Sequence, residues 1–193
     1  MMRILTSLPP GKARFTIVDP VGLGQSLSSF MHLADADERL VSSRIWTDQR
    51  HIEQALVDLT DHLENVIQKY LRNDYETIAQ YNEAAGEIAE PYRFLVLQDF
   101  PTNLSEIAAK RLASLLTSGP RCGIFTLIHQ DRRHALPRGF GEAVLERGTW
   151  ILEQRGDDFH PAEPELSDFK VELQEEISDD QATKVIQAVG AAA

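Results

Sequence analysis

Three short and almost wholly apolar runs, separated by long amphipathic stretches, constrain the fold of this chain more than any other feature. They are residues 14–18 (RFTIV), 93–97 (RFLVL) and 123–128 (GIFTLI). Strands that are apolar throughout are typical of a parallel sheet with both faces covered. Between the first two runs, residues 48–71 place apolar side chains at a spacing of about 3.6 residues, which predicts a long amphipathic helix. The sequence therefore predicts an α/β fold with a mainly parallel sheet and helices on both faces.

Shorter patterns predict the elements between these runs. Either Thr47 or Asp48 is expected to cap the long helix, and Asn103 with Glu106 three residues later has the spacing of a capping box. The other expected elements are a helix end at residues 2–8, a short strand at 44–46, a short helix over 78–89 and a helix from 103 to 116.

The character of the sequence changes after Pro137. Residues 149–152 and 169–173 are expected to be antiparallel or edge strands around an acidic loop that contains proline. Ser178 and Gln181 have capping-box spacing and predict a last short helix from 180 to 189. We therefore expect a core domain over residues 1–136 and, over residues 137–193, an extension with a β-hairpin-like strand pair and a helix.

Composition restricts the classes of function. The chain has 193 residues, of which 42% are hydrophobic and 25% charged, and a single cysteine, Cys122. No stretch approaches the roughly 20 apolar residues that span a bilayer, so we expect a cytoplasmic protein without membrane contact. The net charge is −11, and the only basic cluster is short: Arg132, Arg133, His134 and Arg138. DNA is therefore expected as a partner only indirectly, within a larger assembly.

Two glycine-containing motifs resemble nucleotide-binding loops without matching them. Residues 10–13 (PGKA) lack the earlier glycine, whose place is taken by Thr6, and an alanine follows the lysine where a phosphate-binding loop has Ser or Thr. Gly22 and Gly24 follow a strand, but Leu27 stands where a dinucleotide fingerprint has its third glycine. Both motifs favour a turn. The six histidines and the lone cysteine form no pattern of metal ligands or of a nucleophile with its base.

Asp99 is the strongest single candidate for chemistry. It ends an apolar strand, and open α/β sheets bind ligands in the crevice at the carboxyl ends of their strands. In P-loop ATPases an aspartate at this place orients magnesium, and a following glutamate polarises the attacking water. Here the next residue is Phe100, which cannot act as a base. A structural role, with Asp99 bound to a loop amide before Pro101, is an equally open interpretation.

The order of these segments resembles the motor domain of the FtsK/SpoIIIE family, which has a RecA-like three-layer fold. The similarity spans roughly residues 2–131. Residues 15–20 with Gly22 are similar to a strand that ends in Asp-Pro-Lys-Gly, with Val21 in place of Lys. Residues 68–82 are similar to a helix with Arg-Tyr and a later Tyr-Asn. Residues 93–99 are similar to the Walker B strand, and residues 111–128 to a Gly-Arg-x-x-Gly-Ile-His segment.

The resemblance implies which residues would serve a nucleotide, and where this sequence departs from the family. Asp99 would be the Walker B-like catalytic residue and the magnesium ligand, and the candidate nucleotide-binding residues are Asp19, Gly22, Gly24, Gln130 and Asp131. The family's phosphate-binding loop would lie before residue 1, Phe100 replaces the Walker B glutamate, and the glutamine of a Thr-Gln pair falls on Asp131, with Gln130 one residue short. The family and the related EccC secretion motors include chains with several motor modules in tandem, some of them degenerate.

Three functions follow as hypotheses. The first is a non-catalytic structural or regulatory module of a DNA or protein translocase, with no cofactor of its own, that associates with itself or with other motor subunits. The second is an ATP-hydrolysing translocase domain, completed by a phosphate-binding loop upstream and then binding Mg-ATP. The third is an unrelated flavodoxin-like binding module with a ligand near Asp19, Gly22 and Asp99.

Overall fold

The computed structural model describes residues 1–193 except 43, 73 and 173–176. Within the described residues a parallel sheet has the strand order β1-β2-β3. The strands are β1 (Ala13–Val18), β2 (Tyr92–Phe100) and β3 (Ile124–Gln130). Phe15, Phe94 and Phe125 stand opposite one another in register across the sheet, and their rings stack at centroid distances of 5.5 and 5.6 Å. The predicted α/β fold with a parallel sheet is confirmed.

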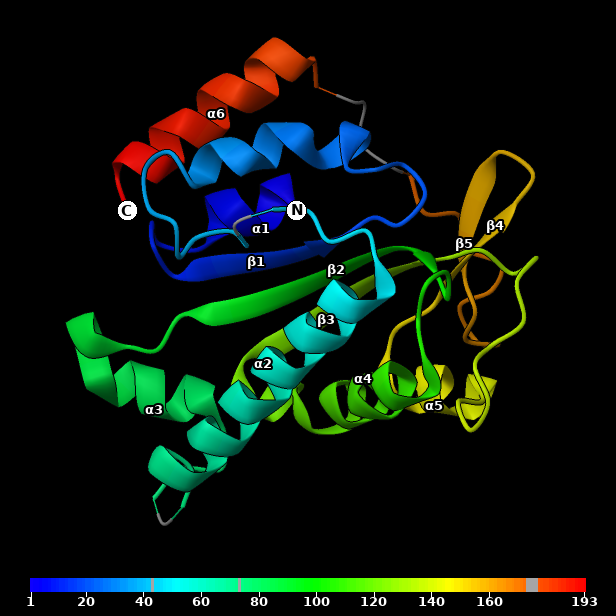
Figure 1. Cartoon of the computed structure of the whole chain (residues 1–193), viewed down its shortest axis with the longest axis horizontal. Coiled ribbons are helices and arrows are strands. Elements are labelled where there is room, and N and C mark those ends of the chain that lie inside the picture. The colour runs from blue at the N-terminus through cyan, green and yellow to red at the C-terminus, as the bar shows by residue number, and fades with distance from the viewer. Residues whose placement is uncertain (43, 73, 173–176) are drawn as a thin grey trace.

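Helices lie on both sides of this sheet (Figure 1). One side carries α1 (Met2–Ser7), the 3-10 helix η1 (Gln25–Leu33) and α6 (Asp179–Ala191). The other side carries α2 (Gln49–Lys69), α3 (Ile78–Ala85), α4 (Glu106–Ser118) and α5 (Glu142–Gly148). Two short 3-10 helices, η2 (Gly86–Ile88) and η3 (Pro120–Cys122), precede β2 and β3. Each side of the sheet has its own apolar cluster, so both faces of the strands are buried.

The chain connections explain which helix covers which face. The connections from β1 to β2 and from β2 to β3 both move across the sheet in one direction, and right-handed crossovers then place α2 and α4 on the same face. After β1, however, the chain first runs through η1 and returns along the outer edge of β1, where Val41 and Trp46 form parallel bridges with Phe15 and Val18. This opposite direction puts η1 on the other face. The connections that leave β1 and β2 therefore run to opposite faces of the sheet.

Two predicted details of this core are wrong. Residues 44–46 form no strand, since Trp46 contributes only an isolated bridge. The helix α4 is capped by Ser105, whose hydroxyl accepts a hydrogen bond from the Ala108 amide, and not by Asn103. Asn103 instead donates its side-chain amide to the Thr47 carbonyl at 2.9 Å, because a turn at Pro101–Leu104 delays the helix. Asp48 caps α2 as predicted.

The C-terminal third contains a hairpin that the sequence patterns placed incorrectly. β4 (Leu152–Arg155) pairs antiparallel with β5 (Asp158–Pro161), joined by a two-residue Gly-Asp turn in which Gly156 has a positive φ of 65°. The strand predicted at 169–173 is reduced to a bridge between Val171 and Phe159, and residue 173 lies outside the described residues. The capping box of α6 is confirmed.

The division at residue 136 stays a prediction, and side chains from both sides of it share the same clusters. Leu145 of α5 packs in the cluster that contains α2 and α4, and Ile186 of α6 packs with Leu5 and Phe15. In the described part of the chain, none of the helices combines the length and the hydropathy that a bilayer span requires.

Candidate functional site

The loop after β1 is organised around the carboxylate of Asp19. This side chain is 1% exposed, although Asp is rarely buried without partners. Its Oδ1 accepts a hydrogen bond from the Gly22 amide and its Oδ2 accepts one from the Gly24 amide, each at 2.8 Å. The carboxylate therefore closes its own loop, and burial leaves its oxygens turned away from solvent.

Both glycines are required by this loop. A Cβ atom at Gly22 would lie 2.7 Å from Oδ2 of Asp19, which is closer than van der Waals contact allows. Gly24 has a φ of 82°, in the left-handed region, and a Cβ atom there would lie 2.7 Å from Cδ1 of Ile45. The structure thus brings Asp19, Gly22 and Gly24 together, with their polar groups directed at one another. This geometry supports the turn interpretation, and a contact of these residues with a cofactor stays a prediction.

The end of β2 contains a bulge that turns Asp99 away from the core. The register moves from Leu97 opposite Ile128 to Phe100 opposite Gln130, so β2 contains one more residue than β3 over this interval. In an unbroken strand, residues three apart point to opposite faces. Because of the extra residue, Leu97 and Phe100 both point into the cluster under α4, and Asp99 occupies the bulge with a φ of 50°. The Phe100–Pro101 peptide bond is cis.

Asp99 is accessible at the carboxyl edge of the sheet. Its side chain is 26% exposed, and its Oδ1 lies 3.7 Å from Nδ1 of His129 on β3. The loop amide of Thr102 donates to the backbone carbonyl of Asp99 at 2.9 Å. The loop is therefore closed by the backbone of Asp99, which leaves its carboxylate available. Within the residues that the structure describes, no three His, Cys, Asp or Glu side chains are placed to share a metal ion.

Gln130 and Asp131 lie beside Asp99, as expected for neighbouring strand ends. Gln130 is the last residue of β3 and stands opposite Phe100. The Asp131 carboxylate holds the Arg133 guanidinium through two close hydrogen bonds, Nη2 to Oδ2 at 2.7 Å and Nε to Oδ1 at 2.9 Å. These hydrogen bonds hold the pKa of the Asp131 carboxyl well below its usual range. Asp131 is therefore engaged by its own loop, and Asp99 is the most exposed carboxylate of the predicted set.

The residue after Asp99 does not face this edge. Phe100 is 2% exposed, and its ring lies 5.5 Å from that of Phe140 within the apolar cluster under α4. A polar side chain at position 100 would consequently be buried in an apolar core and not directed at a ligand beside Asp99.

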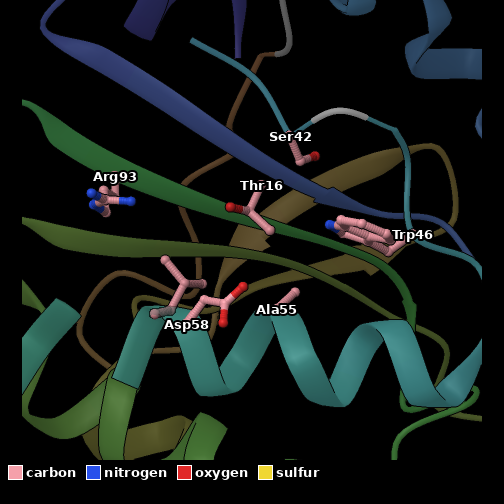
Figure 2. Close-up of a pocket in the computed structure, with 7 residues that line it drawn as sticks. Thr16, Ser42, Trp46, Ala55, Asp58 and Arg93 are labelled. Carbon is pink, nitrogen blue, oxygen red and sulfur yellow. The ribbon is translucent and has the colours of Figure 1, made fainter. Parts of the chain in front are cut away.

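A cavity that the sequence patterns did not indicate lies between β1, α2 and the residues Ser42 and Trp46, which run along the outer edge of β1 (Figure 2). Its volume is about 220 Å³. Its lining residues are Thr16, Ser42, Trp46, Ala55, Asp58, Leu59 and Arg93. Figure 2 shows Arg93 and Trp46 at opposite ends, with Thr16 between them. These residues come from four separate segments, so no local motif marks them. The sequence feature that could have indicated this region is the arginine at the start of each of two apolar strands, Arg14 and Arg93.

Comparison with known proteins shows a structural likeness. No family model matches the sequence, and no curated protein matches it. Among solved structures, the chain is similar to EssC (ATPases 2 and 3) from Geobacillus thermodenitrificans, with a TM-score of 0.65 and 12% identity over 97% of this chain. It is also similar to the cytoplasmic domain of EssC, with a TM-score of 0.59 and 12% identity over 97% of this chain. The chain spans 39% and 40% of those two chains. At this identity the likeness shows the fold alone, an α/β arrangement similar to that of these solved domains.

Proposed function

We propose that this chain is a RecA-like module of an FtsK/SpoIIIE-type motor that supports or regulates neighbouring modules and does not itself hydrolyse ATP. The burial of Phe100 is the observation that carries this proposal. The resemblance described above places the water-polarising glutamate of a motor at position 100, and here that position belongs to the apolar core. Hydrolysis requires a group that orients the attacking water.

The remaining carboxylates also fit a non-catalytic role. Asp19 is occupied by the amides of Gly22 and Gly24, and Asp131 by Arg133. Magnesium in motor ATPases is held by one or two carboxylates together with the phosphates of the nucleotide. Asp99 supplies one such carboxylate, while the 193 residues contain no Gly-x-x-x-x-Gly-Lys-Ser/Thr sequence to hold the phosphates.

The proposal includes a partner and a location. A module that keeps the motor framework without its chemistry acts through contact, so its partners are proposed to be copies of itself or other motor subunits, with DNA or polypeptide cargo reached only through the assembly. The likeness to EssC ATPase domains, one of them described as the cytoplasmic domain of EssC, supports a secretion-motor setting in the cytoplasm.

Isothermal titration of the chain with ATP and magnesium tests the proposal. We expect no binding heat in the micromolar range and no phosphate release, in the wild type and in Asp99→Ala alike. Micromolar binding that Asp99→Ala abolishes would overturn it. Sedimentation velocity at increasing protein concentration tests the partner, with association expected and a strict monomer contradicting it.

The alternative is an ATPase completed by a preceding segment, and one observation favours it. Asp99 is partly exposed at the carboxyl edge, in a bulge of the kind that is common beside active sites. In a longer chain that supplies a phosphate-binding loop, this alternative predicts magnesium-dependent hydrolysis that Asp99→Ala abolishes. Hydrolysis that survives Asp99→Ala would rule it out.

A further inference from the structure

Two arginines stand side by side on the face of the sheet that α2 covers. Arg14 on β1 and Arg93 on β2 are direct partners in the register of the two parallel strands. Partners in register project to the same face of a sheet, within reach of each other's long side chains. The neighbouring partners on that face, Val18 and Leu97, pack in the cluster with α2, so both guanidinium groups lie on the α2 side.

Neither guanidinium is paired with an acidic side chain among the residues that the structure describes. The Nε atoms of Arg14 and of Arg93 are both buried and have no hydrogen-bond partner. Both residues are partly exposed, and their terminal nitrogens take part in none of the ion pairs between described residues, so these nitrogens are open to a ligand. Arg93 also lines the cavity between β1 and α2 (Figure 2).

The surrounding groups do not neutralise the pair. Burial, followed by the charges of Arg93 and Arg14, lowers the pKa of His62 on α2 to about 4, so this histidine is neutral near pH 7. Glu90 is the nearby acid, and its carboxylate accepts a hydrogen bond from the Tyr70 hydroxyl at 3.3 Å and lies 3.9 Å from Nε2 of His62.

Two further carboxylates lie around the pair, and both have other partners. Asp58 lines the cavity and accepts a hydrogen bond from Gln54 at 2.8 Å. Asp37, which feels the charge of Arg14, is held by Arg39 with Nη2 2.7 Å from Oδ2. Burial, and then the charge of Arg14, lowers the pKa of Arg93, and the smaller opposing effect of the Glu90 charge does not cancel this shift.

Like charges directly opposite each other on adjacent strands are unfavourable, and a partly buried cation without a partner keeps its desolvation cost. Two adjacent guanidinium groups present several N–H donors in planar forks, the arrangement that matches the oxygens of phosphate. A dianion between them would offset both charges and supply acceptors for their terminal N–H groups.

We propose that Arg14 and Arg93 together form a binding site for a tetrahedral oxyanion, either free phosphate or the phosphate group of an ester, at the Arg93 end of the cavity. The site lies near the starts of β1 and β2, whereas Asp99 and Asp131 lie at or just beyond the carboxyl ends of β2 and β3. It is therefore separate from the edge where the proposed function is tested, and it does not depend on that function.

Thermal unfolding with inorganic phosphate tests this site, with sodium chloride used to hold the ionic strength constant. The wild type is expected to gain roughly 3–6 °C at a phosphate concentration ten times its Kd. The double variant Arg14→Gln/Arg93→Gln is expected to gain nothing. The matched control Arg121→Gln/Arg147→Gln removes two exposed arginines elsewhere and is expected to gain as much as the wild type.

A second measurement keeps the test decisive where the double variant does not fold. Titration of Arg93→Lys with phosphate, followed by ³¹P line broadening, is expected to show binding about tenfold weaker, since lysine keeps the charge but loses the fork. Glycerol phosphate distinguishes the sources: equal binding indicates a phosphate ester, and binding of inorganic phosphate alone indicates the free ion. No gain for the wild type, or equal gains for the wild type and the double variant, would overturn the proposal.

Discussion

Asp19 follows β1 and Asp99 lies in the bulge near the end of the neighbouring parallel strand β2, yet the structure uses their carboxylates in opposite ways. Asp19 is 1% exposed, with one loop amide on each oxygen. Asp99 is 26% exposed and closes its loop through its backbone carbonyl. The difference comes from what surrounds each residue: two glycines allow the chain to fold back onto Asp19, whereas a bulge turns Asp99 outward. A carboxylate at a strand end is therefore available to a ligand only where the following loop does not occupy it.

Replacing the residue next to Asp99 is the strongest way to break this comparison. Phe100→Glu would put a carboxylate into the apolar cluster beside Phe140, and we expect it to lower the free energy of unfolding by about 4 kcal/mol or more. Urea denaturation measures this loss, with Phe100→Leu as the control for lost volume, expected to lose about 1–2 kcal/mol. A stable Phe100→Glu variant that hydrolyses ATP would show that position 100 can face the site.

The next largest effect separates the two aspartates directly. Asp19→Ala leaves the amides of Gly22 and Gly24 without their acceptors, and the Gly24 amide is buried, so we expect a loss of about 2–3 kcal/mol in the free energy of unfolding. Asp99→Ala is expected to lose less than about 1 kcal/mol, because the loop amide at Thr102 keeps its backbone acceptor. Chemical denaturation of both variants gives the comparison, and equal losses would contradict it.

A third prediction concerns the face of the sheet under α2, where the imidazole of His62 is largely buried. The pKa of His62 is lowered from 6.5 to about 4 in the folded chain, mainly by burial. Between these values the unfolded chain binds a proton that the folded chain does not, so the free energy of unfolding falls as the pH drops from 6.5 to 4. We expect His62→Gln to reduce this fall by about 1–2 kcal/mol, since solvent screens part of the effect. Denaturation at pH 7 and pH 4 measures it, and an equal fall in the wild type and in His62→Gln would contradict it.

The smallest expected effect isolates the crowding in the Asp19 loop. Gly24 and Gly139 both have a positive φ, of 82° and 78°, but a Cβ atom would meet Ile45 at Gly24 and nothing within 4 Å at Gly139. Alanine at either position costs about 1 kcal/mol for the backbone, and Gly24→Ala is expected to lose roughly another 1 kcal/mol through steric contact. Thermal unfolding compares the two variants, and identical losses would show that Ile45 moves aside.

Local patterns correctly predicted those elements for which many residues in a row carry the same signal. The strand cores and α2 were predicted correctly because apolar runs and a long helical stripe record burial directly. The misplaced elements had weaker signals. Ser105 and Asn103 both suit a helix cap, and only the turn at Pro101 decided between them. The two-residue turn of the β4–β5 hairpin contains Gly156, a turn signal that is present in the sequence, whereas Val171 forms only an isolated bridge with Phe159.

The sequence by itself determined the parallel α/β framework and identified Asp19 and Asp99 as the residues at its strand ends, because periodicity and strand termini are local properties. Only the tertiary structure decided what those residues do. The burial of Phe100 and the pairing of Arg14 with Arg93 depend on a bulge and on the register between strands that are distant in the chain. Such contacts leave no periodic trace in the sequence, since each is formed by the meeting of two separately encoded pieces.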